Sequence, residues 1–466
     1  MDIPVEYVPL KIKINFSFGS FANNMLNGFV FANLTFFYQI KLGLAAELLG
    51  IGWLIFAIWN TLNDPLASYL IDNTRTKIGR RIPYIRYGSF LYGLAFIFCW
   101  FPIAPLDNEI FLFLNFLAAL FLLDTMFTFV GACYFSLPNE IAVTAKGRAS
   151  ISVYNAIAAF GNLVIGLILP VILFTGHEGL PPYFGPAIIV IGVVCAITLF
   201  ITSFFIKENM FAQMQPHEGL IEGLKLTFKN KPFWILMIPM FCIYLVTPII
   251  STGFLYYIEF VVAGQVIIFF IFSLIIGIII GMVLTILVIP KWHPKKTAFM
   301  NLILIAIGLA ILFFVGQNAI LAALPYFLIG IGFAGAMVAV PVILGDAIDN
   351  DELITGKRRE AVYGGVNALV NKPAISIANW MFLLTLASFG FDANKQTQTQ
   401  MAITGILVSI FAIPAILIGV SAIILLFFYP LDGPEWRKQK KYIIELHEQK
   451  EKEYIQKLVK EGKIKT

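Results

Sequence analysis

The sequence has little charge: 13% of its 466 residues are Asp, Glu, Lys or Arg, whereas 59% are hydrophobic. Soluble domains carry about 25% charged residues, so this chain cannot cover several water-exposed domains, and its mean hydropathy of +0.86 agrees. The net charge of +5 does not indicate a nucleic-acid partner, because the basic residues are spread between apolar runs. These properties predict a protein that crosses the lipid bilayer several times and binds no nucleic acid.

Cysteine and histidine are also scarce, with four residues of each. The cysteines lie inside apolar runs without C-x-x-C spacing, which argues against a thiolate metal site or a disulfide framework. The histidines fall between or beyond the apolar runs, so imidazole is not expected to relay protons inside the membrane. No G-x-S-x-G or H-E-x-x-H motif occurs. We therefore expect no catalytic residue, no metal and no cofactor, and any proton chemistry in the membrane must use carboxylates.

Apolar stretches of about 20 residues, the length that spans a bilayer as a helix, predict an all-α integral membrane fold with twelve transmembrane helices. The predicted spans are residues 16–40, 44–72, 85–102, 110–137, 151–174, 187–206, 233–261, 263–289, 297–315, 319–345, 362–390 and 401–429. They form two six-helix halves, 1–206 and 233–430, joined by a linker at 207–232 with an interfacial helical pattern. The tail, 431–466, alternates Lys with Glu and predicts a solvated surface helix without an active role.

Basic residues in the loops predict the orientation of the chain. Only Lys41 and Lys395 fall on one side of the membrane, and every other loop Lys or Arg falls on the other side. Positively charged loops stay in the cytoplasm. Both termini, the linker and the tail are therefore predicted to be cytoplasmic in a multi-pass protein of the cell membrane.

Three charged residues lie deep inside predicted spans: Asp64, Asp124 and Lys372. A charge in hydrocarbon costs at least about 2.5 to 3.5 kcal/mol, so each is a functional hypothesis. At a rise of 1.5 Å per residue they lie about 12, 20 and 15 Å from the cytoplasmic ends of their helices. We expect them to approach the midplane, where transporters bind substrate and coupling ion. The amides predicted at a similar depth are Asn24, Asn27 and Asn60.

Each charged residue also has a structural alternative. Asp64 precedes Pro65 and could accept hydrogen bonds at a helix kink, and Lys372 could neutralise it. Asp124 could bind neighbouring helices through Asn or Thr side chains. These alternatives stay open at the level of the sequence.

Several motifs, in order along nearly the whole chain, resemble one transporter family. They are Asn60-Thr-Leu-Asn63-Asp64-Pro65, Asp72-Asn-Thr-Arg75 with Gly79-Arg80-Arg81-Ile-Pro83, Asn230-Lys-Pro-Phe233, Ser251-Thr-Gly253-Phe-Leu-Tyr256-Tyr257, and Asp346-Ala-Ile-Asp349 followed by Arg358-Arg-Glu360. This set is similar to the signature of the glycoside-pentoside-hexuronide:cation symporters, a branch of the major facilitator superfamily. The resemblance implies a twelve-helix alternating-access symporter of sugars, driven by H⁺ or Na⁺.

The resemblance also assigns roles to residues. It implies a cation site at Asp64, with Asn60 where the family has a second Asp. The predicted substrate contacts are Asn24, Asn27 and Asp124, because of their depth in the spans, and Lys372 and Tyr256, which the resemblance adds. The family's carboxylate sugar anchors on the first and fourth spans correspond to Asn24 and Gly131, so melibiose-like recognition is not implied. Lys372 matches a lysine shared with a branch that carries lysophospholipids, and an anionic or amphipathic substrate is therefore the alternative to a sugar.

Charged motifs at the cytoplasmic ends of the two halves predict a gate. Opposite charges on equivalent loops can form salt bridges that close this side and break when the halves move. The predicted gate residues are Asp72, Arg75, Arg80, Arg81, Asp346, Asp349, Arg358 and Glu360. Helix-end capping and topology are the structural alternative for each.

We therefore predict a secondary transporter rather than an enzyme, acting as a monomer on a small molecule, with proton coupling favoured over Na⁺. A membrane prenyltransferase would need acidic residues that share a magnesium ion, but Asp64 and Asp72 lie about 12 Å apart along one helix. A non-transporting receptor or scaffold with the same fold is the other alternative, because fold does not determine function.

Overall fold

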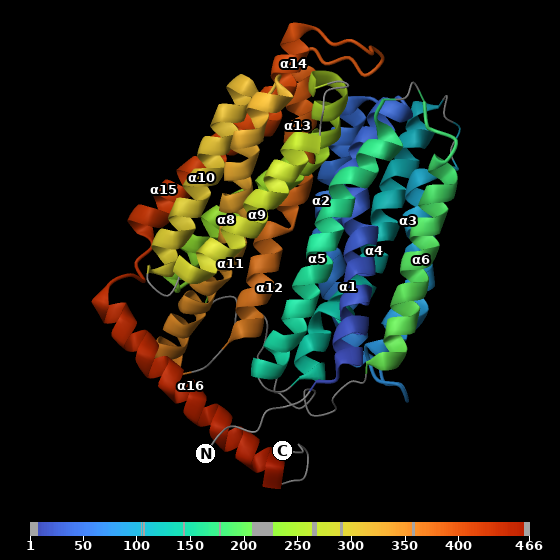
Figure 1. Ribbon diagram of the computed structural model, residues 1–466. Helices are drawn as coiled ribbons and strands as arrows, with labels where there is room; N and C mark the ends of the chain where they lie inside the picture. The colour runs from blue at the N-terminus through green and yellow to red at the C-terminus, as the bar shows by residue number, and fades with distance from the viewer. Residues whose placement is uncertain are drawn as a thin grey trace. The chain divides into compact units, whose positions relative to one another are not determined.

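The computed structural model describes residues 8–103, 105, 108–142, 145–176, 179–206, 227–262, 268–288, 292–356 and 359–460. All regular secondary structure in these ranges is helical (Figure 1). The chain divides into two compact units at residues 216 and 217, and residues 449–466 group with the first unit. The predicted linker falls mostly on residues 207–226, which lie outside the described residues.

The first unit contains six long helices in chain order. They are α1 (Leu10–Phe36) with its π-helical continuation η1 (Phe37–Lys41), α2 (Ala46–Asn73), α3 (Ile82–Trp100), α4 (Glu109–Ile141), α5 (Ala145–Phe174) and α6 (Phe184–Phe205). Within this unit α1 packs against both α5 and α6, and α2 packs against α4. The α2–α4 contact is the one that positions the candidate site.

The second unit contains six further long segments and the beginning of the C-terminal helix. They are α8 (Lys231–Tyr256) with η3 (Tyr257–Val262), α9 (Ile268–Val288), α10 (Pro294–Val315), α11 (Ala319–Thr355), α12 (Glu360–Asn371) with α13 (Pro373–Ser388), and α14 (Gln400–Leu407) with η4 (Val408–Ala412) and α15 (Ile413–Phe428). The C-terminal helix α16 spans Pro434–Lys460.

Ten of the described helices are long and apolar enough to cross a membrane. The helices α1 and α2 are also long, at 27 and 28 residues, but asparagines lower their hydropathy. With these two, the described part of the chain has twelve long helical segments, the number that the sequence predicts. These two more polar helices carry predicted site residues: α1 has the substrate residues Asn24 and Asn27, and α2 has the cation site.

Glycines let α9 and α11 approach closely in the second unit. A methyl group at Gly277 or Gly281 of α9 would overlap the backbone carbonyls of Phe327 and Ile331 on α11. Small residues four positions apart allow this close helix packing. The contact fixes α11, whose far end carries an acidic cluster.

The end of α11 corrects one expectation from the sequence. Asp346 and Asp349, predicted to lie in a loop after residue 345, belong to the helix, which continues to Thr355. It ends at Gly356, which adopts a left-handed conformation with φ 70° and donates its N–H to the carbonyl of Glu352 at 2.8 Å. Only glycine adopts this conformation without strain, so the helix stop is set ten residues later than hydropathy alone predicts.

The tail also differs from the expected solvated helix. It is helical, but Trp436 and Ile443 of α16 are 4% and 0% exposed. These two apolar side chains are removed from water within the second unit, where α16 begins (Figure 1). The tail therefore packs on the protein instead of presenting all its faces to solvent.

Candidate functional site

A hydrogen-bonded network in the first unit joins the two acidic residues found in the middle of its helices. The Asn63 amide Nδ2 on α2 donates to Asp124 Oδ2 on α4 at 2.9 Å and to Thr128 Oγ1 at 3.0 Å. Thr128 Oγ1 donates in turn to Asp64 Oδ1 at 3.3 Å. One amide and one hydroxyl thus connect the two carboxylates. We call these four residues the two-carboxylate network.

Burial and helix packing hold this network in place. Asn63, Asp124 and Thr128 are 5%, 2% and 4% exposed, and Asp64 is half-buried. Asp124 and Thr128 are four residues apart on α4, so their side chains lie on the same face of that helix. An aromatic contact fixes α2 against this helix, because the ring of Trp59 stacks on Phe121 with centroids 4.8 Å apart.

Further amides of the first unit are buried without a hydrogen-bond partner among the described residues. These atoms are Oδ1 of Asn27, Asn60 and Asn155 and both amide atoms of Asn23. Asn24 is half-buried and makes one hydrogen bond within α1. Leaving a buried polar group unpaired costs about 1 to 3 kcal/mol. The predicted site residues Asn60 and Asn27 therefore retain the capacity to bind a polar ligand.

Gly131 lies next to one of these amides. A Cβ atom at Gly131 on α4 would lie 3.6 Å from Nδ2 of Asn23 on α1. The position that corresponds to the family's carboxylate on the fourth span therefore has no side chain, and the neutral amide of Asn23 lies beside it. Asn23 was not among the predicted site residues, although its position next to Asn24 in a predicted span is a detectable signal.

In the second unit, polar residues gather where the eleventh predicted span is interrupted. The helix α12 ends at Asn371 and α13 begins at Pro373, so the half-buried Lys372 lies at the junction. Asn371 and Ser376 are 2% and 0% exposed, and Asn371 Oδ1 and Ser376 Oγ have no hydrogen-bond partner among the described residues. Lys372 is thus accompanied by unsatisfied neutral polar atoms on its own span.

Tyr256 has a different environment. Its ring is 0% exposed and lies 5.0 Å from that of Phe382 and 5.7 Å from that of Phe391, measured between centroids. The contacts place Tyr256 in the aromatic packing of the second unit. A substrate contact by this residue stays a prediction.

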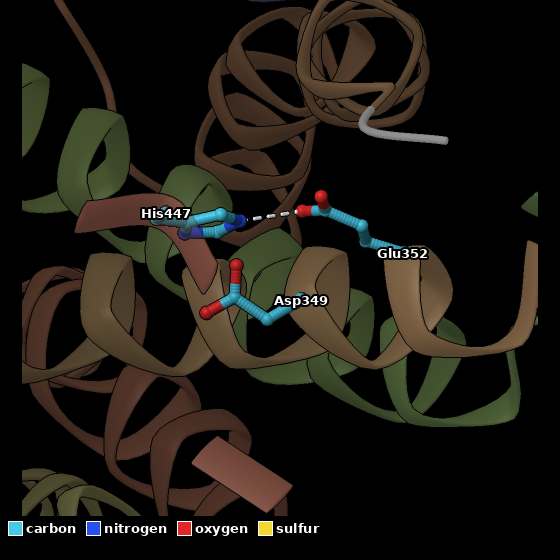
Figure 2. Close-up of side chains that lie close together, drawn as sticks. All are labelled: Asp349, Glu352 and His447. Atoms are coloured by element: carbon cyan, nitrogen blue, oxygen red, sulfur yellow. Dashed lines mark hydrogen bonds and ion pairs between the residues drawn. The ribbon is translucent and has the colours of Figure 1, made fainter. Parts of the chain in front are cut away.

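A second polar cluster lies at the end of α11, where α16 crosses it. Lys440 Nζ lies 2.8 Å from Asp346 Oδ1 and also binds Asp349. His447 Nε2 lies 2.7 Å from Glu352 Oε2, with Asp349 beside this pair (Figure 2). We call these five residues the α11–α16 cluster. Its three carboxylates are 3% to 5% exposed, so the tail helix covers acidic groups that would otherwise contact water.

Electrostatics match this arrangement. Burial lowers the pKa of Lys440, but the carboxylates of Asp346 and Asp349 more than offset it and raise the pKa above its ordinary value. The ligand-capable atoms of Asp349, Glu352 and His447 lie within 4.8 Å of one another. Lys440 and His447 already bind carboxylate oxygens of this cluster.

A neighbouring ion pair holds the connection after α11. Arg359 Nε donates to Asp351 Oδ2 at 3.0 Å, and its NH2 group donates to both carboxylate oxygens at 2.6 Å. The two side chains are 3% and 6% exposed. This bidentate pair fixes the start of α12, and through it the span that carries Lys372.

The structure describes the side chains of three other predicted gate residues. Arg75 is exposed, and Arg80 and Arg81 are half-buried in the turn before α3. Asp72 lies in the last turn of α2, but its side chain lies outside the described residues, as do Arg358 and the side chain of Glu360. The gate residues thus remain predictions, except that Asp346 and Asp349 are engaged by Lys440 within the second unit.

The amino-acid sequence matches a known protein family. The family described as "MFS/sugar transport protein" matches residues 15–433. Inner membrane symporter YicJ of Escherichia coli is 24% identical over 433 residues, covering 91% of this chain and 93% of that protein. The isoprimeverose transporter of Lactiplantibacillus pentosus is 22% identical, covering 90% of this chain and 89% of that protein.

The fold has solved counterparts. The structure of a D-xylose-proton symporter matches with a TM-score of 0.63 and 14% identity, covering 90% of this chain and 97% of that one. At this level of identity the match shows the fold alone. It agrees with the twelve-segment arrangement described above.

Proposed function

Because the chain belongs to the MFS/sugar transport protein family and is a multi-pass membrane transporter rather than an enzyme, we propose that it is a cation-coupled symporter of a small solute. In such a carrier the coupling ion and the substrate bind near the membrane midplane, and the two halves expose the site to each side alternately. The proposal places both termini in the cytoplasm of the cell, on the basis of the Lys and Arg distribution.

The observation that carries the coupling proposal is the surroundings of Asp64. This carboxylate is half-buried in the interior of α2 and accepts a hydrogen bond from Thr128. One helical turn earlier, the Asn60 carbonyl oxygen is buried without a partner among the described residues. A carboxylate in the membrane interior is costly unless it binds a cation or a proton, so its retention there favours ion binding.

We propose H⁺ as the coupling ion, with Na⁺ as the alternative. Na⁺ prefers several oxygen ligands, and Asn60 supplies only a neutral oxygen where the related symporters have a carboxylate. A proton needs only one carboxylate oxygen, which Asp64 supplies without a second acidic group. Asp64 would then take up a proton on one side of the membrane and release it on the other.

For the substrate we propose a sugar or glycoside. Support comes from the relative described as an isoprimeverose transporter and from the unpartnered amides of Asn23 and Asn27. Amide groups both donate and accept, which suits hydroxyl groups that do the same. Asn24 lies on the same helix and is the third amide proposed to contact the sugar.

A second candidate substrate class is a small anionic or amphipathic molecule. It is favoured by Lys372, whose ammonium group lies on the same span as the unpartnered Asn371 Oδ1 and Ser376 Oγ. An ammonium group binds a carboxylate or phosphate as a point charge. A neutral sugar has no negative charge for the Lys372 ammonium group to bind.

The test is transport by the purified protein in vesicles, after a thermal-shift screen has identified a stabilising solute among glycosides, hexuronates and lysolipids. A ligand stabilises only the state that it binds. Under an imposed pH gradient, Asp64→Asn should abolish accumulation against the gradient while exchange persists. Glu47→Gln removes an exposed carboxylate of the same helix and should leave accumulation unchanged. If Asp64→Asn still concentrates the solute, Asp64 does not couple transport.

A further inference from the structure

Asp124 lies in the wrong place to replace a sugar-binding carboxylate at Gly131, because it is seven residues earlier on α4. In the structure, Asp124 instead accepts a hydrogen bond from the same amide that donates to Thr128, the partner of Asp64. The Asn63 amide donates to Asp124 and to Thr128, and Thr128 donates to Asp64. The two carboxylates therefore belong to one network, although they come from different helices.

Sequence positions show how unusual this pair is within the first unit. The other acidic residues in helices α1 to α6, Glu47, Asp72, Glu109 and Glu140, lie near helix ends, where a carboxylate can reach water. Asp64 and Asp124 are both in helix interiors, and Asp124 is 2% exposed. Two carboxylates of one network repel each other, and a cation bound by their oxygens relieves this repulsion.

A third group on the same helix has an unsatisfied oxygen. The Oδ1 atom of Asn60 is buried and has no partner among the described residues, and Asn60 precedes Asp64 by one helical turn. An unpartnered carbonyl oxygen is a ligand for a cation, as are carboxylate oxygens and the Thr128 hydroxyl. The candidate ligands are therefore the Asn60 oxygen, the Thr128 hydroxyl and the carboxyl groups of Asp64 and Asp124.

We infer that Asp124 is the second carboxylate of the coupling-ion site and supplies from α4 the charge that Asn60 does not supply from α2. This inference rests on the proposed cation-coupled transport. The site holds one monovalent cation, which is either a proton shared by the pair or a Na⁺ ion bound by the same oxygens. Asn63 acts as the positioning residue, because its amide orients Asp124 and Thr128 together.

The experiment measures the melting temperature of the purified full-length protein, without any transported solute. It is run at pH 8 and pH 6, with Na⁺ or with choline at equal ionic strength. A Na⁺ site predicts a rise of the melting temperature in Na⁺ at pH 8. A shared proton predicts a rise from pH 8 to pH 6 in choline. Among the described residues, Tyr92 on α3 lies within electrostatic range of Asp124.

Asp64→Asn and Asp124→Asn should each remove the same ion response, and the double variant should lose no more than either single variant. Asn keeps an oxygen that can accept the hydrogen bond from Asn63, so the helix contact is retained. Glu47→Gln should respond like the parent. Moving the carboxylate to α2 in Asn60→Asp/Asp124→Asn should restore a Na⁺ response, which a purely structural role of Asp124 does not predict.

Two results would overturn the inference. If Asp64→Asn loses the response while Asp124→Asn keeps it, Asp124 is a packing residue and the proposed function stands. If the parent responds to neither Na⁺ nor acid, the coupling site is absent and both proposals fail.

Discussion

Lys440 Nζ lies 2.8 Å from Asp346 Oδ1, although 94 positions of sequence separate the two residues. The same ammonium group binds Asp349, one turn further along α11. The contact links the C-terminal helix α16 to the end of the helix that packs on α9 and α10. A residue of the charged tail thus neutralises acidic groups that the sequence assigns to the gate.

The first prediction concerns this link. Lys440→Gln should release the beginning of α16, because it leaves Asp346 and Asp349 buried without their cation. Trypsin should then cleave the tail faster, whereas Lys441→Gln, whose side chain is 81% exposed, should have no effect. Cleavage of the Lys440→Gln variant at the parental rate would show that Trp436 and Ile443 alone hold the tail.

The second prediction concerns the pair of Arg359 and Asp351. Removing one partner of a buried ion pair costs about 3 to 5 kcal/mol, because the other charge stays buried. Arg359→Gln should therefore lower the melting temperature strongly. The double variant Arg359→Gln/Asp351→Asn should recover part of the loss, since no uncompensated charge remains. Equal melting temperatures of the single and double variants would contradict this account.

The third prediction is a pH dependence at His293, which caps α10 through Nδ1. Burial lowers the pKa of His293 below its ordinary value of 6.5, and the nearby Asp432 only partly offsets this. Asp346, Lys295 and Arg437 are the other charged groups that act on it. His293 binds a proton more readily in the unfolded chain than in the folded protein. Its contribution to the free energy of unfolding is therefore complete above pH 6.5 and is lost as the pH falls below it.

His293→Asn provides the test, since Asn is a good N-cap residue that cannot be protonated in this range. Between pH 7 and pH 5.5, the melting temperature of the variant should fall less than that of the parent. A parallel decline of both proteins would assign the acid sensitivity to other groups.

The helices were predictable because the signal for a membrane span is local. The second predicted span, 44–72, agrees with α2 at Ala46–Asn73 within two residues, and the ninth, 297–315, ends where α10 ends. The segment after residue 345 was not predictable in this way. Its acidic residues look like a loop in the sequence, and they stay helical and buried because a helix almost 100 residues later covers them.

The candidate site was predictable only in part, for a similar reason. Asp64 and Asp124 are detectable as charges within apolar runs. Their connection requires Asn63 on α2 to meet Thr128 on α4, and this depends on the register of two packed helices. A threonine in a helix gives no signal of its own, although the four-residue spacing from Asp124 to Thr128 would have placed both on one face of α4.

The last prediction concerns the proposed cytoplasmic gate. Arg80 and Arg81 lie in the turn that connects α2 to α3, next to the exposed Lys77. If the two arginines stabilise the state that is closed on the cytoplasmic side, Arg80→Gln/Arg81→Gln should favour the inward-open state. An exposed ion pair contributes about 0 to 1 kcal/mol, so two of them shift the ratio of the states by up to about 30-fold.

Labelling of single cysteines on each side of the substrate cavity measures this ratio, in a background where the four native cysteines are replaced. The double variant should react faster than the parent with a reagent added from the cytoplasmic side and more slowly from the outside. Lys77→Gln removes a positive charge from the same turn and is the matched control. Opposite changes on the two sides identify a shift between states, because local loosening of the turn would raise reactivity on the cytoplasmic side only. Unchanged labelling in the double variant would exclude these arginines from the gate.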